Sequence, residues 1–156
     1  MDRIRHKWSF ENGFISENEL KAITKDFEKV LPFIEAKFLA GIRDREGIGK
    51  CSNWVSFRAN GQYVADTFFF GTENITSGQD IDMDSGLYNN AVIAFLSIAK
   101  KHLQHAIHIE TTVSDQEWSR AMGLCSNILG HEYDLMDITQ NGKLRFKTWE
   151  LETSYV

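Results

Sequence analysis

The chain has 156 residues, of which 42% are hydrophobic and 25% are charged, and its formal net charge is -5 at pH 7. These values are typical of one soluble globular domain and exclude a disordered, collagen-like or coiled-coil chain. The mild negative charge disfavours non-specific nucleic-acid binding, and no apolar run approaches the roughly 18 residues of a membrane span. The charged N-terminus does not resemble a secretory signal, and the two cysteines, Cys51 and Cys125, fit a reducing compartment. We therefore expect a cytoplasmic protein without a nucleic-acid or membrane partner, folded as one domain over residues 1–156.

Residues 3–10 predict a first strand, anchored by Ile4 and Trp8. This strand also carries a short basic cluster, which holds too few aromatic residues for a nucleic-acid surface. We interpret the cluster as a solvated strand edge. Its members are Arg3, Arg5, His6 and Lys7.

A broken helix is predicted next. Ser16 and Glu19 have the spacing of a capping box, and apolar residues then recur with a helical period as far as Phe38. Pro32 falls inside this pattern and removes a helix hydrogen bond, so we expect two helices or one kinked helix. We expect residues 41–49 to form a charged loop.

Residues 52–70 hold the strongest strand signal, and Asn60-Gly61 between their two β-rich runs predicts a hairpin with a type I′ turn. Residues 71–85 form either a loop or a short strand around Ile81–Met83. Between residues 59 and 99 there is no Lys or Arg, which predicts either a solvated acidic loop or a surface that attracts a cationic group. The acidic residues of this stretch are Asp66, Glu73, Asp80, Asp82 and Asp84.

The C-terminal half begins with a central helix over residues 86–103, whose wide apolar stripe indicates heavy packing. Residues 107–113 alternate as a half-buried strand. The strands before and after the central helix are expected to lie side by side in parallel.

A second capping box, Ser114 with Glu117, opens a helix that ends near Gly130 and holds Cys125 on its apolar face. A closing hairpin is predicted around Asn141-Gly142. The order is therefore β-α-α-β-β-(β)-α-β-α-β-β. The fold class is α+β, a single domain with a mostly antiparallel, mixed sheet flanked by helices.

Two carboxylates are candidates for a general base. Glu110 lies in the middle of a strand on its less apolar side, where a carboxylate that faces a cleft can accept a proton. Glu73 follows the strand that ends near Phe70. Each of them is otherwise a solvent-facing or ion-paired glutamate. His102, His105 and His108 are spaced by three, but no acidic residue completes a ligand set, so we expect no metal site.

The order of elements resembles the fold of the GNAT family of N-acetyltransferases: a strand, a broken helix pair, a three-stranded meander, a central helix, a strand, a helix and a hairpin. Pro32 falls where the helix pair of that family divides, and Leu129-Gly130-His131-Glu132 is similar to the motif that closes its last helix. The chain also looks similar to acetyltransferase-like proteins that phages encode. The family binds acyl-CoA pyrophosphate on a Gly-rich turn at the start of the central helix. The corresponding residues here are Ser85, Gly86, Leu87 and Tyr88.

The resemblance implies a divergent N-acyltransferase that binds acetyl-CoA at this turn and acetylates a cationic amine, with Glu73 or Glu110 taking the proton. The alternative is a non-catalytic binding protein that uses its acidic surface on a basic protein partner. Such a protein could be a toxin-immunity factor, a phage inhibitor of a host enzyme or a virion component. Met83 and Tyr88 depart from the family's turn motif, and acidic residues beside a pyrophosphate would repel it. These departures favour the alternative.

Overall fold

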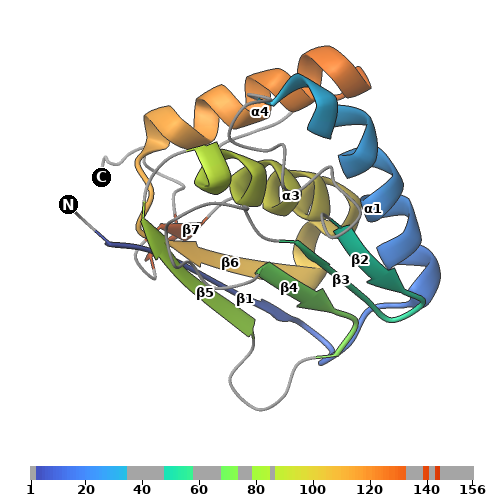
Figure 1. Ribbon diagram of the computed structural model, residues 1–156. Coiled ribbons are helices and arrows are strands. Elements are labelled where there is room, and N and C mark those ends of the chain that lie inside the picture. Colours follow the sequence, from blue (N-terminus) through green and yellow to red (C-terminus); the bar gives the residue numbers. More distant parts are fainter. Residues whose placement is uncertain are drawn as a thin grey trace.

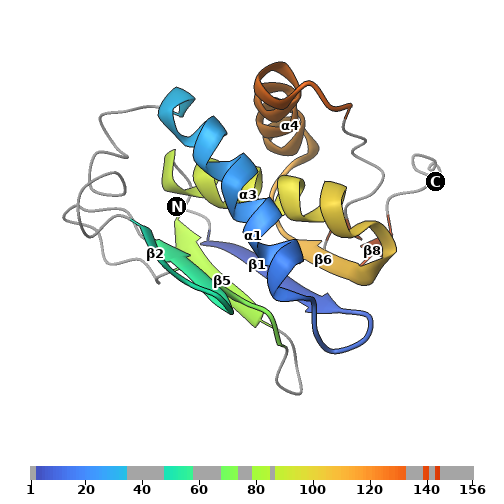
Figure 2. The ribbon, with the colours of Figure 1, turned by 90° about the vertical axis from the view of Figure 1, so that its right-hand side faces the viewer.

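The computed structural model describes residues 3–34, 48–57, 68–73, 79–84, 87–132, 139–140 and 143–144. Within them the fold is α+β, with three α-helices on one side of two small sheets (Figure 1; Figure 2). The elements are β1 (Arg3–Phe10), α1 (Glu17–Val30), η1 (Leu31–Phe33), β2 (Ile48–Cys51), β3 (Trp54–Phe57), β4 (Phe68–Gly71), β5 (Gln79–Asp84), α3 (Leu87–Leu103), η2 (Gln104–Ala106), β6 (Ile107–Thr111), α4 (Asp115–Leu129), β7 (Thr139–Gln140) and β8 (Lys143–Leu144). The larger sheet has the strand order β5-β1-β6-β7-β8, and the smaller has the order β2-β3-β4.

Strand β1 lies inside the larger sheet, because it pairs antiparallel with β5 on one side and with β6 on the other. The interpretation of its basic residues as a strand edge is therefore wrong. Its alternate residues from Ile4 to Phe10 are buried, including His6, whereas Arg5 between them is exposed. The two-residue period of a strand thus divides β1 into a buried face and an open face.

Of the two predictions for residues 71–85, a loop or a short strand around Ile81–Met83, the strand is correct, but β5 is longer, Gln79–Asp84, and pairs with β1. β5 and β6 run in the same direction, each antiparallel to β1, which lies between them. The prediction that the two strands around the central helix are adjacent is therefore wrong, although they are parallel. A crossover helix can return the chain across one strand as well as to the next position. The sequence around the helix does not distinguish these cases.

Strands β3 and β4 pair antiparallel, as expected for residues 52–70. The predicted turn at Asn60-Gly61 lies outside the described residues. Phe57 pairs with Phe68, whereas a regular hairpin closed by that two-residue turn would pair Phe57 with Val64.

The third strand of the smaller sheet is β2, which was not predicted. Part of it, Ile48 and Gly49, falls in the residues expected to be a loop. Cys51 pairs with Trp54, so only Ser52 and Asn53 connect β2 to β3. The meander is therefore β2-β3-β4, and β5 is not part of it.

Both ends of α1 follow from the sequence. The predicted capping box is present: Glu19 N–H donates to Ser16 Oγ at 3.0 Å, and Ser16 N–H donates to Glu19 Oε1 at 2.8 Å. The helix ends at Val30, and one 3-10 turn containing Pro32 leads to an extended Ile34. The predicted break at Pro32 is confirmed, and the continuation of the pattern to Phe38 lies outside the described residues.

The ends of α4 are also as predicted, except for one detail. Ser114 Oγ accepts the N–H of Glu117 at 3.3 Å, and Gly130 ends the helix in the left-handed conformation, with φ of 77°. The carboxylate of Glu117 does not complete the capping box, because it turns to Asn89 of α3 and to the Ser114 hydroxyl. Beyond α4, β7 and β8 pair antiparallel around Asn141-Gly142, which agrees with the predicted closing hairpin.

Aromatic rings form the centre of the core and join the helices to both sheets. Phe95 of α3 lies with its ring centroid 5.2 Å from that of Phe27 in α1 and 5.1 Å from those of Phe68 and Phe70 in β4. Trp8 of β1 packs on the same two β4 rings, at 5.2 and 5.7 Å. All these side chains are buried. The ring of Phe95 therefore joins α3 to both α1 and β4.

We predict that Phe95→Ala lowers the free energy of unfolding by about 3–5 kcal/mol, because it leaves a cavity among rings that cannot close over it. Phe69→Ala is the matched control. Phe69 is 50% exposed and stacks only on Trp54 among the rings of the described residues, so its loss should cost about 1 kcal/mol. Urea denaturation measures both, and similar losses for the two variants would contradict this account of the core.

Candidate functional site

Two helices begin at the same end of the larger sheet. β5 ends at Asp84 and α3 begins at Leu87, while β6 ends at Thr111 and α4 begins at Asp115. Since β5 and β6 run in the same direction, both helices start where β1 begins (Figure 1). Crevices at the carboxyl ends of parallel strands are frequent ligand sites.

The residues predicted to bind the cofactor belong to this end of the sheet. Leu87 and Tyr88 open α3, whereas Ser85 and Gly86 lie outside the described residues. The first backbone N–H groups of a helix have no acceptor within it, and the helix dipole favours an anion there. The first turn of α3 contains no acidic residue that would oppose an anion.

The sheet register places basic positions opposite the acidic ones near this helix start. Arg3 pairs with Asp84, and Arg5 pairs with Asp82. No Lys or Arg is close to these acids in the chain, but the pairing with β1 places two arginine positions opposite them. Arg5 is on the open face of β1, which is turned away from the helices, so the register does not bring its side chain to the start of α3.

A buried hydrogen-bonded network ties β1 to the starts of both helices. His6, which has no exposed surface, lies with Nε2 2.7 Å from Asn89 Oδ1 and Nδ1 3.0 Å from Thr111 Oγ1. Asn89 Nδ2 donates to Glu117 Oε1 at 3.3 Å. The indole of Trp118 packs edge-on against the imidazole, with ring centroids 6.0 Å apart. β1, β6, α3 and α4 therefore meet at one histidine.

The direction of each hydrogen bond in this network is fixed from its charged end. Because the Glu117 carboxylate only accepts, the Asn89 amide nitrogen donates to it and the amide oxygen faces His6. His6 Nε2 must then carry the proton, and Nδ1 accepts from the Thr111 hydroxyl. The Thr111 oxygen in turn accepts the N–H of Val113 at 3.1 Å. Every member of the network is satisfied by a neutral imidazole.

Burial keeps His6 neutral. Desolvation lowers its pKa from 6.5 to about 4, and the hydrogen bond with Asn89 offsets this only in part. Thr111, His6 and Asn89 have the order of a nucleophile, a base and an orienting group. However, Thr111 is 2% exposed, and an imidazole with so low a pKa is a weak base. The network is therefore structural.

The structure does not bring Glu73 and Glu110 together or place either at the start of α3. Glu110 lies on the open face of β6, opposite Lys7 of β1, while its neighbours Ile109 and Thr111 face the helices. Glu73 follows β4 in the smaller sheet and forms an isolated bridge with Phe14 beyond the end of β1. Both glutamates are exposed.

Two of the three spaced histidines make separate surface contacts. His102 Nε2 lies 2.7 Å from Asp26 of α1, and His108 Nε2 lies 2.5 Å from Glu11. No group of three possible metal ligands gathers among the described residues. Cys125 is buried as predicted, and burial raises its pKa to about 12, so the thiol is unreactive.

The residues that sequence reasoning missed are those of the network. His6 alternates with Ile4, Trp8 and Phe10, and this period of two could have placed it on the buried face. Nothing local in the sequence marks Asn89 or Glu117 as its partners, because their contacts join parts of the chain far apart.

Comparison with known proteins found no relative for this chain. No family model matches it, and neither the curated proteins nor the solved structures contain a significant match. In the part of the chain that the structure describes, no helix has both the length and the apolar character needed to cross a membrane.

We predict that the free energy of unfolding decreases as the pH is lowered from about 6.5 to 4, because of His6. In this range the unfolded chain binds a proton at His6 and the folded protein does not. The stability contributed by neutral His6 is therefore fully present above pH 6.5 and is lost as the pH approaches 4. The full change is about 3 kcal/mol. Urea denaturation at several pH values measures it. His6→Gln keeps an N–H donor for Asn89 but does not titrate, and an unchanged pH slope in this variant would contradict the assignment.

Proposed function

We propose that this chain is a divergent acyl-CoA N-acyltransferase-like protein that binds acetyl-CoA at the start of α3 and, if active, acetylates a cationic amine. The observation that carries the proposal is the step from β5 to α3, which places a helix start without acidic residues at the carboxyl end of a strand. The free backbone N–H groups of a helix start suit a pyrophosphate.

The resemblance to the GNAT family is best supported in the segment from β5 to the closing hairpin. There the order strand, helix, strand, helix, hairpin agrees with the resemblance. The N-terminal half fits less well, because β1 separates β5 from β6 and the meander is a sheet of its own. We therefore base the proposal on the segment from β5 to the closing hairpin, which contains the start of α3, and not on the topology of the whole chain.

A second candidate, a non-catalytic binding protein with a basic partner, is favoured by the positions of the glutamates. Glu110 is on the sheet face opposite the helices, and Glu73 belongs to the other sheet. Neither is placed to take a proton from an amine at the start of α3 without a chain of water molecules. Binding without transfer is the expected behaviour of such an arrangement.

We predict that acetyl-CoA at about a hundred times its dissociation constant raises the unfolding midpoint by roughly 5–10 °C. Gly86→Trp should abolish the shift, because its bulky side chain would stand where the family resemblance places the pyrophosphate. Gly123→Trp is the matched control, since a side chain at this exposed α4 position meets open space. Thermal unfolding monitored by fluorescence measures all three proteins.

The same samples distinguish acetyl transfer from binding of acetyl-CoA without transfer. Release of free CoA thiol in the presence of amines would support transfer, whereas a shift without thiol release would support binding alone. No shift at millimolar acetyl-CoA, or an equal shift in Gly86→Trp, would remove the acyl-CoA proposal.

A further inference from the structure

The helices cover one face of the sheet β2-β3-β4 and leave its other face open (Figure 1). In β4, Phe69 is 50% exposed between two buried phenylalanines, and in β3 Trp54 is partly exposed beside the buried Val55. The open face of the larger sheet instead carries charged side chains such as Arg5 and Glu110. The open face of the smaller sheet is therefore unusual in presenting aromatic rings.

The exposed ring of Phe69 is held in place by two neighbours. It stacks on Trp54, with ring centroids 5.7 Å apart and an angle of 24° between the planes. It also leans along its own strand, because a Cβ added to Gly71 would lie 3.3 Å from Phe69 Cε1. Gly71 is the cross-strand partner of Trp54, so the Phe69 ring takes the place beside Trp54 that a side chain at Gly71 would fill. A ring that is ordered before binding loses little entropy when a partner contacts it.

A carboxylate lies on the same face. The Thr72 N–H donates to the Asn53 carbonyl at 3.0 Å, and Thr72 is buried, so the alternation of β4 continues one residue beyond its end. Glu73 then projects on the side of Phe69. Glu73 also forms an antiparallel bridge with Phe14, and bridged residues have their side chains on one side. Phe14 is 62% exposed, so the carboxylate is placed between exposed aromatic residues. We call the surface formed by Trp54, Phe69, Glu73 and Phe14 the aromatic face.

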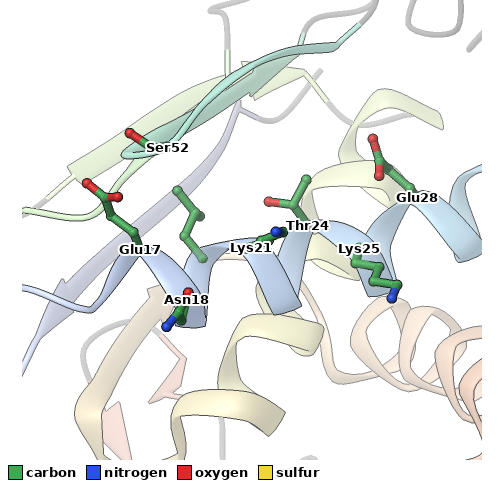
Figure 3. A pocket seen from close by; sticks show the side chains of 8 residues that line it. Glu17, Asn18, Lys21, Thr24, Lys25, Glu28 and Ser52 are labelled. Atoms are coloured by element: carbon green, nitrogen blue, oxygen red, sulfur yellow. The ribbon is translucent and has the colours of Figure 1, made fainter.

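The charge of the aromatic face is negative and unbalanced. β3 and β4 contain no Lys or Arg, and the chain has none between residues 59 and 99. The groove along α1 is different, because its lining combines two glutamates with two lysines, Glu17, Glu28, Lys21 and Lys25 (Figure 3). An apolar partner that covered the aromatic face would bury the Glu73 carboxylate without a counter-charge, which costs free energy. The face therefore fits a partner that brings both a flat apolar surface and a positive charge.

We propose that the aromatic face binds an arginine side chain of a protein partner. The planar guanidinium group stacks on the Trp54–Phe69 pair and donates to the Glu73 carboxylate. Two residues of extended chain, about 7 Å, separate Glu73 from Gly71, so one side chain reaches both the ring over Gly71 and the carboxylate. Glu73 has other contacts, but a carboxylate has about four acceptor positions and can receive a further donor. Lysine fits less well, because its ammonium group is neither planar nor bidentate.

This inference rests on the second candidate function, a binding protein with a basic partner, and names its contact surface. It does not depend on acetyl-CoA, because no residue of the aromatic face belongs to β5 or α3.

The test is calorimetric titration of the full chain with a peptide that alternates glycine and arginine, at low ionic strength. A peptide of the same length with lysine in place of arginine carries the same charge and should bind at least about fivefold more weakly. Equal affinities for the two peptides would reduce the interaction to net charge and overturn the proposal.

Variants locate the binding. Phe69→Ala should weaken binding of the arginine peptide about fivefold, and Glu73→Gln about tenfold. Phe69→Tyr keeps the ring and should retain the affinity, which distinguishes a lost contact from a folding defect. Phe33→Ala is the matched control, since Phe33 is equally exposed, at 62%, but belongs to η1. Glu132→Gln makes the same charge change as Glu73→Gln outside the face. Both controls should bind like the unchanged chain, and losses as large as those of the face variants would contradict the assignment.

The remaining outcomes separate this inference from the functions on which the article has drawn so far. Peptide binding that persists in both face variants would leave a basic partner possible but overturn the aromatic face as its site. Sedimentation of the chain as a dimer that Phe69→Ala converts to a monomer would assign the face to a second copy and would also overturn it. Phe69→Ala should keep the full acetyl-CoA shift, so the acyl-CoA proposal succeeds or fails independently.

Discussion

The buried face of β1 is the constraint on which the remaining elements depend. Its residues point away from the open face of the sheet and contact three different parts of the fold. His6 bonds to α3 and β6, while Trp8 and Phe10 pack on the rings of β4. β1 lies between the parallel strands β5 and β6, so the helix α3 that joins these two strands has to cross over β1. The helices and the smaller sheet are thus positioned by a single eight-residue strand near the N-terminus.

The polar part of this face imposes a stricter requirement than the apolar part. Apolar rings of similar volume can exchange with modest loss, but a buried imidazole needs partners of the correct polarity on both nitrogens. Asn89 and Thr111 meet this requirement only when α3 and β6 are in their present register with β1. Glu117 then fixes the amide orientation from α4. The network is therefore satisfied in only one arrangement of β1, β6, α3 and α4. A purely aromatic core would specify that arrangement less strictly.

The sequence predicts local features of this fold well and non-local ones poorly. The cap at Ser16, the break at Pro32 and the end of α4 at Gly130 each depend on neighbours within about four residues, and each is confirmed. The paired residues of β1 and β5 are between 71 positions (Trp8 and Gln79) and 81 positions (Arg3 and Asp84) apart in the chain, and no local pattern encodes that pairing. The same limit affected the candidate site. Alternation placed Glu110 on the less apolar side correctly, but only the sheet arrangement decides that this side faces away from the helices.

The proposed acyl-CoA region lies next to the polar part of the core, and this decides what can be learned from variants. The start of α3 is held by the His6 network, so a change there alters both the ligand contacts and the arrangement of four elements. Loss of acetyl-CoA binding in a variant of this region is therefore informative only beside a control that tests folding alone. Gly123 on α4 supplies that control, because a side chain added at this exposed position meets open space.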